Sequence, residues 1–214
     1  MDGTVISTCL PPDKSTKIMR KLPDEIWFCV EDFSGNTCQG LNGCKVSLNR
    51  GIGCCFTHKG NLLVLHPRGR SFLEICIKTS RQKREIANQT LESLLTGTAK
   101  ETIVAETKQF SNLVISQGGD TVIITDKNGT VKNTFKRPNA KFRSITTDIQ
   151  GDILVADFQS NFVSVLTEDG IFYREILNSI DNGIKGIEHI DVNESGIMCF
   201  THCDALQTEV YLYK

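Results

Sequence analysis

The sequence predicts an all-β protein, a β-propeller built from repeated four-stranded antiparallel blades. The first observation is a regular succession of strands and turns over residues 142–177, FRSITTDIQGDILVADFQSNFVSVLTEDGIFYREIL. The second is that residues 112–135 align without a gap with residues 153–176, at an offset of 41. A period near 40 residues with several short strands per unit is typical of propellers. We therefore expect about five blades, or an incomplete six-bladed ring, in residues 19–214.

The best blade, residues 142–177, reads as about four short strands separated by polar turns. Asp148 and Gly151 stand at the first and fourth positions of a predicted type I turn. The apolar run 153–155 is continuous rather than alternating, which predicts a strand covered on both faces. Asp157 ends this strand, and we expect its carboxylate to accept backbone N–H groups of the turn that follows.

The second best blade is predicted over residues 110–135. In the ungapped alignment Val114 falls on Val155, and the pair Asn128-Gly129 falls on Asp169-Gly170. Both of these dipeptides predict two-residue hairpins of type I′. Apolar positions and turn positions therefore coincide even where the residues differ.

Three further units are weaker. Residues 51–77 and 186–214 repeat the order of strand, polar turn and strand, and residues 24–32, DEIWFCVED, predict the inner strand of a first unit. Together they bring the number of units to about five, with the first and last incomplete or divergent.

Two segments fall outside this pattern. Residues 80–100 allow either a short helix that ends near Gly97 or an irregular strand and loop between blades. Residues 1–18 are predicted to be a flexible leader.

The composition limits the classes of function. The formal net charge is −1 and no run of about 18 apolar residues occurs, so neither general attraction to nucleic acid nor a membrane span is expected. Nine cysteines, an odd number, without a visible export signal predict reduced thiols in a cytoplasmic protein. Neither a cofactor nor a structural metal is expected.

One local feature predicts a binding site. Residues 131–143 hold five basic side chains and no acid, in the stretch that joins the two best blades. These candidate RNA-binding or partner-binding residues are Lys132, Lys136, Arg137, Lys141 and Arg143. Phe135 and Phe142 lie between them and allow base stacking beside phosphate contacts. The alternative is a solvated connector with core phenylalanines. A second basic segment, residues 78–84, matters only if it lies on the same rim.

Catalytic signals are weak, and we expect no enzyme. No Gly-x-Ser-x-Gly motif or phosphate-binding loop occurs. The segment CFTH occurs twice, at 55–58 and 199–202, and each copy has a further cysteine beside or near it. Neighbouring strand residues point to opposite faces, so buried structural residues explain these segments better than a metal site.

The residues Asp148, Gly151, Asp157 and Asp169-Gly170, with the apolar positions between them, closely resemble an NHL repeat. The whole also resembles the C-terminal propeller-like region of tripartite-motif proteins, although no RING, B-box or coiled coil is present in this sequence. The resemblance implies a non-catalytic scaffold or substrate-recognition propeller with a protein partner, and it points to the ubiquitin pathway. It permits RNA binding through basic loops as an alternative, and a propeller-type hydrolase or lyase as a third. No small-molecule substrate and no membrane are expected.

Overall fold

The structure is a computed structural model in which the chain forms two compact units, Met1–Gly51 and Ile52–Lys214. The residues that it describes are 15–22, 25–32, 35–40, 45–48, 54–57, 59, 61–65, 71–76, 81–95, 102–177, 186–193, 195–202 and 208–212. No helix of these residues is long and apolar enough to cross a membrane.

The first unit contains one antiparallel sheet in the order β1-β2-β3-β4. Its strands are β1 (Ser15–Leu22), β2 (Glu25–Asp32), β3 (Gly35–Gly40) and β4 (Lys45–Leu48). Residues 25–32 of the segment predicted as the inner strand of a first unit thus form the second strand of this sheet. Strand β1 begins at Ser15, so residues 15–18 of the predicted leader belong to the sheet.

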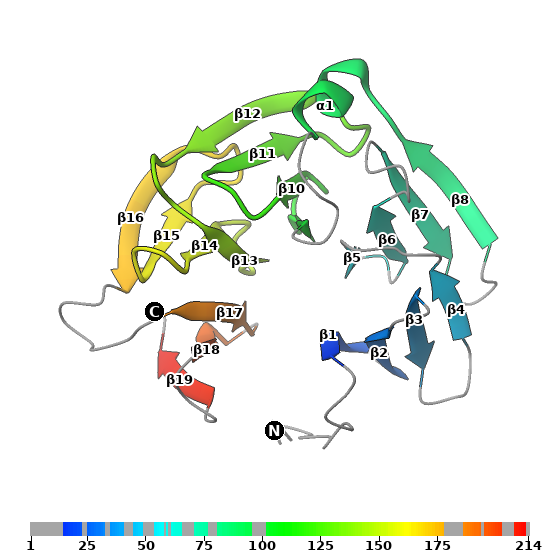
Figure 1. Ribbon diagram of the computed structural model, residues 1–214, viewed down its shortest axis with the longest axis horizontal. Helices are drawn as coiled ribbons and strands as arrows, with labels where there is room; N and C mark the ends of the chain where they lie inside the picture. The colour runs from blue at the N-terminus through cyan, green and yellow to red at the C-terminus, as the bar shows by residue number, and fades with distance from the viewer. Residues whose placement is uncertain are drawn as a thin grey trace. The chain divides into compact units, whose positions relative to one another are not determined.

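The second unit contains four antiparallel sheets that follow one another along the chain (Figure 1). Three have four strands and the last has three. The strands are β5 (Cys54–Phe56), β6 (Leu62–Leu65), β7 (Phe72–Cys76) and β8 (Arg81–Ile86); β9 (Ile103–Glu106), β10 (Leu113–Ser116), β11 (Thr121–Thr125) and β12 (Val131–Lys136); β13 (Phe142–Thr147), β14 (Ile153–Asp157), β15 (Phe162–Leu166) and β16 (Phe172–Leu177); and β17 (Ile187–Val192), β18 (Ile197–His202) and β19 (Thr208–Leu212).

The predicted blades 110–135 and 142–177 are therefore consecutive antiparallel sheets. The boundary of the earlier blade was wrong, because its first strand, β9, lies before residue 110. Strands β11 and β12 superpose on β15 and β16 in sequence at the predicted offset of 41. Even an irregularity repeats, since the register shift between Ile124 and Thr125 recurs between Val165 and Leu166.

The core of the second unit lies between neighbouring sheets. The first strands lie side by side, β5 with β9, β9 with β13, and β13 with β17. Three clusters of buried apolar side chains fill the three spaces between successive sheets. Leu154 of β14 packs toward the sheet that follows, and its neighbours Ile153 and Val155 pack toward the sheet that precedes. The continuous apolar run is thus covered on both faces, as predicted.

The ungapped alignment was wrong in one strand. Val114 belongs to the cluster on the side of the following sheet, as Leu154 does, whereas Val155 faces the preceding sheet. The pairing agrees, because Val114 lies opposite Ile124 and Leu154 lies opposite Val165. The offset is therefore 40 in the second strand and 41 in the third and fourth.

The turns confirm one prediction and correct another. The Gly151 N–H donates to the Asp148 carbonyl at 3.2 Å, as expected for a type I turn. Asp169-Gly170 does not form a type I′ turn, which needs positive φ at both central residues. Gly170 has φ 79° and Asp169 has no positive φ, so a type I turn is followed by a left-handed glycine. Asn128-Gly129 behaves in the same way, with φ 87° at Gly129.

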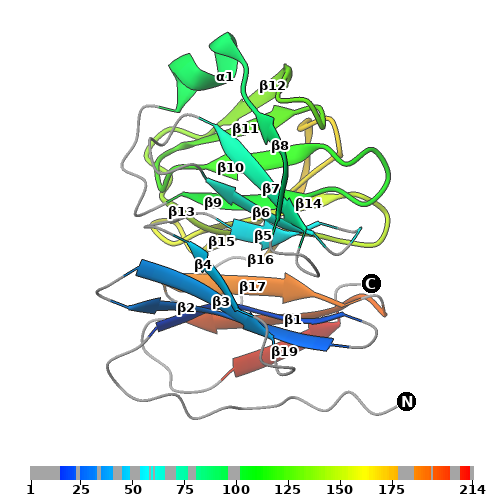
Figure 2. The ribbon, with the colours of Figure 1, turned by 90° about the vertical axis from the view of Figure 1, so that its right-hand side faces the viewer.

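Both readings of residues 80–100 are partly right, because strand β8 is followed by the short helix α1 (Gln89–Leu94). The Asn88 side chain caps the helix by accepting a hydrogen bond from the Thr90 N–H. Leu91 and Leu95 are buried one helical turn apart, against the core between the first two sheets of the second unit. Figure 2 shows α1 at the top of the second unit, near β8 and β12.

Candidate functional site

Exposed apolar side chains concentrate in one region of the second unit. Among the described residues, six large hydrophobic side chains are exposed, and five of them lie on three turns and the strand that follows the last turn. We call these five the apolar surface: Phe110, Ile149, Ile171, Phe172 and Tyr173. Phe110 is 56% exposed, and Ile171 and Tyr173 are each 62% exposed. Gathered exposed apolar residues mark recognition sites, whereas single scattered ones need no explanation.

Glu168 joins the three turns that carry this surface. Its Oε1 accepts hydrogen bonds from the Thr107 hydroxyl and from the Phe110 N–H, both in the β9–β10 turn. Its Oε2 lies in the space that Gly151 leaves open in the β13–β14 turn, where a Cβ would approach it to 2.8 Å. A carboxylate of the β15–β16 turn thus fixes turns from two neighbouring sheets against each other.

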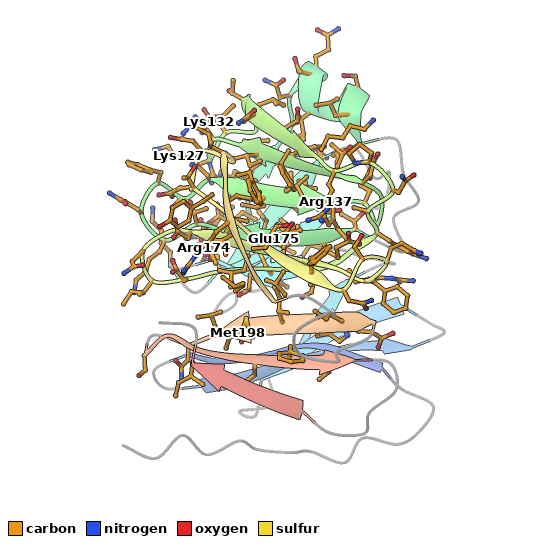
Figure 3. All side chains as sticks on the ribbon, turned by 90° about the vertical axis from the view of Figure 1, so that its left-hand side faces the viewer. Lys127, Lys132, Arg137, Arg174, Glu175 and Met198 are labelled. Carbon is orange, nitrogen blue, oxygen red and sulfur yellow. The ribbon has the colours of Figure 1, made fainter. Side chains whose placement is uncertain are left out.

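Basic side chains flank the apolar surface. Lys132 Nζ lies 5.8 Å from the Phe110 ring centroid and 2.9 Å from Asp169 Oδ1, and the Arg174 guanidinium lies 5.5 Å from the Tyr173 ring centroid. Figure 3 shows Lys127, Lys132 and Arg174 toward one side of these sheets and Arg137 toward the other.

Carboxylates in the same turns serve the fold. Asp126 accepts hydrogen bonds from the backbone N–H groups of Asn128 and Thr130, and these bonds lower its pKa although burial acts to raise it. Burial raises the pKa of Asp152, and the nearby Asp148 and Glu168 carboxylates add to this effect. These groups hold turns together, and the most exposed carboxylate here, Asp169, already binds Lys132.

The predicted basic segment does not form one loop. Residues 131–136 and 142–147 are strands β12 and β13, so the connector consists only of residues 137–141. Lys132 lies at the start of β12 beside the apolar surface. The other four basic residues gather around the connector at the far end of β12: Lys136, Arg137, Lys141 and Arg143.

Most of these basic groups already have partners. Three are paired with carboxylates: Lys132 with Asp169 at 2.9 Å, Lys136 with Asp120 at 3.6 Å, and Arg137 with Glu175 at 2.7 Å. Arg137 and Arg143 also lie over the rings of Phe162 and Phe158. Phe142 is fully buried and Phe135 packs against the same cluster, so the reading of these rings as core phenylalanines is the one that the geometry favours.

The second basic segment contributes little that the structure describes. Lys78 lies outside the described residues. Arg84 on β8 donates to Glu74 at 2.6 Å, and the Asn61 side chain donates to the same carboxylate at 2.7 Å. Burial acts to raise the pKa of Glu74, but these two hydrogen bonds together with the charges of Arg84 and Lys83 lower it overall.

The two CFTH segments show no metal-binding arrangement in the part of the chain that the structure describes, where no three His, Cys, Asp or Glu side chains are grouped to hold an ion. Cys55 and Cys199 are half-buried, and burial raises the pKa of the Cys199 thiol. His58, His66 and Cys203 lie outside the described residues.

Sequence reasoning missed the apolar surface. The sequence feature that could have indicated this surface is a large apolar residue beside a turn, as in Phe110-Ser111-Asn112 and Gly170-Ile171-Phe172. Such residues resemble strand ends in the sequence, and only the packing of neighbouring sheets shows that they stay exposed.

No family model and no curated protein matches this chain. Among solved structures, it is similar to virginiamycin B lyase from Staphylococcus aureus, with a TM-score of 0.64 and 14% identity over 94% of this chain and 71% of that chain. It is also similar to the WD40 β-propeller domain of Doa1, with a TM-score of 0.61 and 10% identity over 87% of this chain and 60% of that chain. A protein of unknown function from Bacteroides caccae gives a TM-score of 0.62 and 17% identity over 83% of this chain and 66% of that chain. At these identities the likeness shows the fold alone, and the fold is an all-β propeller.

Proposed function

We propose that this chain is a non-catalytic propeller that binds a protein partner through the apolar surface. The observation that carries the proposal is that, among the described residues, five of the six exposed large hydrophobic side chains lie on three turns and on the strand that follows the last turn. Turns held on a rigid sheet scaffold are suited to recognition, because they are already ordered and lose little conformational entropy on binding. Glu168 supplies such an anchor here.

The alternatives have less support. Similarity to a lyase at 14% identity supports a shared fold and does not support a shared reaction. RNA binding through residues 131–143 is the second candidate, but three of the five basic groups are already neutralised by carboxylates. The resemblance to NHL repeats of tripartite-motif proteins agrees with a recognition role, and it rests on the single repeat around residues 148–170.

The proposal is tested by comparing the proteins that bind to the wild-type chain and to a variant of the apolar surface. The variant is Phe110→Ser with Ile171→Ser and Tyr173→Ser, and the matched control is Leu94→Ser, the exposed apolar residue outside this surface. Quantitative mass spectrometry of proteins retained from a cell extract should find a defined set that the triple variant loses and the control keeps.

A retained set that is the same for all three chains would contradict the proposal. Turnover of a small molecule by the purified chain would contradict the non-catalytic part of it.

A further inference from the structure

Successive sheets of the second unit meet through a repeated contact. The outer strand of one sheet touches the last turn of the next sheet, through Arg84 and Asn128 in one case and through Asn133 and Asp169 in the other. Asn128 and Asp169 are equivalent at the offset of 41, and Arg84 and Asn133 each follow the bulged residue of their strand.

Helix α1 covers the first of these two contacts. Leu91 and Leu95 are buried there, in the cluster that also holds Ile86, and Val131 packs against that cluster. A Cβ on Gly129 would lie 3.0 Å from Ile86 and 3.4 Å from Leu91, so helix and turn are in direct contact. The helix lies over the outer side of the meeting point between β8 and β12 (Figure 1).

No described residue covers the second contact in this way. The connector that carries α1 spans residues 87–102, whereas the connector after β12 spans only residues 137–141 and forms no helix. The equivalents of Thr130, Val131 and Lys132 at the offset of 41 are Ile171, Phe172 and Tyr173. Phe172 stacks on Phe135 with ring centroids 6.3 Å apart, yet it is 49% exposed. An apolar cluster thus lies open at the place where the preceding contact is closed by a helix.

We propose that the surface formed by Phe135, Ile171 and Phe172 binds a short amphipathic helix of a protein partner, in the position that α1 occupies on the preceding contact. This inference rests on the proposed function and names the form of the partner. The helix presents two aliphatic side chains one turn apart, as α1 presents Leu91 and Leu95. Such side chains pack on the exposed ring of Phe172 and on Ile171.

Two other occupants fit less well. A strand added to β16 is disfavoured, because register shifts leave Tyr173 and Ile176 without cross-strand partners and distort the strand. Single-stranded RNA is disfavoured, because Lys132, a basic group beside this surface, is already paired with Asp169 at 2.9 Å, which leaves it less available to a phosphate.

The test uses the full chain and a displayed library of helical peptides about 16 residues long, randomised on one face. We expect the selected peptides to share aliphatic residues four positions apart. A labelled selected peptide, titrated by fluorescence anisotropy, should bind the Ile171→Ala/Phe172→Ala variant about tenfold more weakly than the wild type. Leu94→Ala should leave its affinity unchanged. Both substitutions fall on exposed side chains, and circular dichroism melting checks that the fold is kept.

Several results would overturn the inference. Selected peptides whose binding ignores the double variant, peptides without the spacing of four, or full competition by single-stranded RNA would each do so. The extract experiment separates the two proposals. If the apolar-surface variant loses bound proteins but no helical peptide can be selected, the proposed function stands and the helical partner is ruled out.

Discussion

At the scale of single residues, the turns of the second unit depend on glycine for a steric reason. Gly129, Gly151, Gly170 and Gly196 all have positive φ, between 74° and 94°, and each N–H donates to the carbonyl three residues earlier. A side chain at such a φ is strained. At Gly170 it would also lack space, because a Cβ would lie 2.5 Å from Ile124 Cδ1 in the core.

Gly170→Ala is therefore expected to lower the free energy of unfolding by about 2–4 kcal/mol, since backbone strain and core overpacking add. Gly119→Ala is the matched control, because a Cβ there meets nothing within 4 Å and φ is not positive. Urea denaturation measures both. Equal effects of the two substitutions would contradict this account of the turn.

Glu74 predicts a pH dependence of stability. Its pKa is lowered below 4.5 by hydrogen bonds from Arg84 and Asn61, in spite of burial. A lowered folded-state pKa means that the stabilisation is present at neutral pH and is lost as the pH falls through the folded-state value. Glu74→Gln should therefore cost about 1–3 kcal/mol at pH 7, and progressively less as the pH falls below the folded-state pKa of Glu74.

Denaturant titrations of the Glu74→Gln variant and the wild type at several pH values provide the measurement. Glu92→Gln, at a half-buried position of α1, serves as a control that should cost little at any pH. If the destabilisation by Glu74→Gln did not change with pH, the ionised Glu74 carboxylate would not be the source of the stabilisation.

At the scale of elements, α1 is stabilised by packing and not by its own length. A helix of six residues is not stable alone, so its burial of Leu91 must hold it. Leu91→Ala should destabilise the chain by about 2–5 kcal/mol, whereas Leu94→Ala, 38% exposed, should cost less than about 1 kcal/mol. Thermal or urea unfolding measures the free energy of unfolding of both variants. Similar losses for the two would show that Leu91 does not anchor the helix to the core.

The second strand of each blade shows why sequence does not fix a register by itself. Val114 and Ile115 are both fully buried, on opposite faces of β10, and the same holds for Leu154 and Val155 of β14. A strand that is apolar on both faces has no alternation, so a shift by one residue leaves the pattern intact but exchanges the faces. The structure sets the register through the third strand, where Val122 and Val163 are equivalent.

At the scale of the whole molecule, the second unit has its core between sheets, so stability should fall from inner strands to outer ones. All residues of β14 are buried, whereas residues 172–175 of β16 are exposed. We expect amide hydrogens of β14 to exchange at least about a hundredfold more slowly than those of β16, as measured by hydrogen exchange and mass spectrometry. Comparable rates would mean that the sheet opens only as one unit.

The charge distribution over the molecule predicts weak RNA binding. The net charge is −1, and Asp120 and Glu175 offset the basic groups around residues 137–141. Four free phosphate contacts with single-stranded RNA would give a slope of log K against log salt of about −3. We expect a slope near zero for the wild type, and no further change in Lys136→Ala/Lys141→Ala. A steep slope that this variant abolishes would favour RNA as the ligand.

The sequence by itself determined the repeat, the positions of most strands in the two best blades, the turns at Asp148 and Asp169, and the coverage of 153–155 on both faces. These features depend on residues close together in the chain, where apolar period and turn chemistry act directly. Only the tertiary structure decided the register of the second strands, the pairing of Arg137 with Glu175, and the exposure of Ile171, Phe172 and Tyr173. The physical reason is that each of these is set by a neighbouring strand or sheet: a charge is neutralised, or an apolar side chain is buried, only where another element comes close enough to cover it.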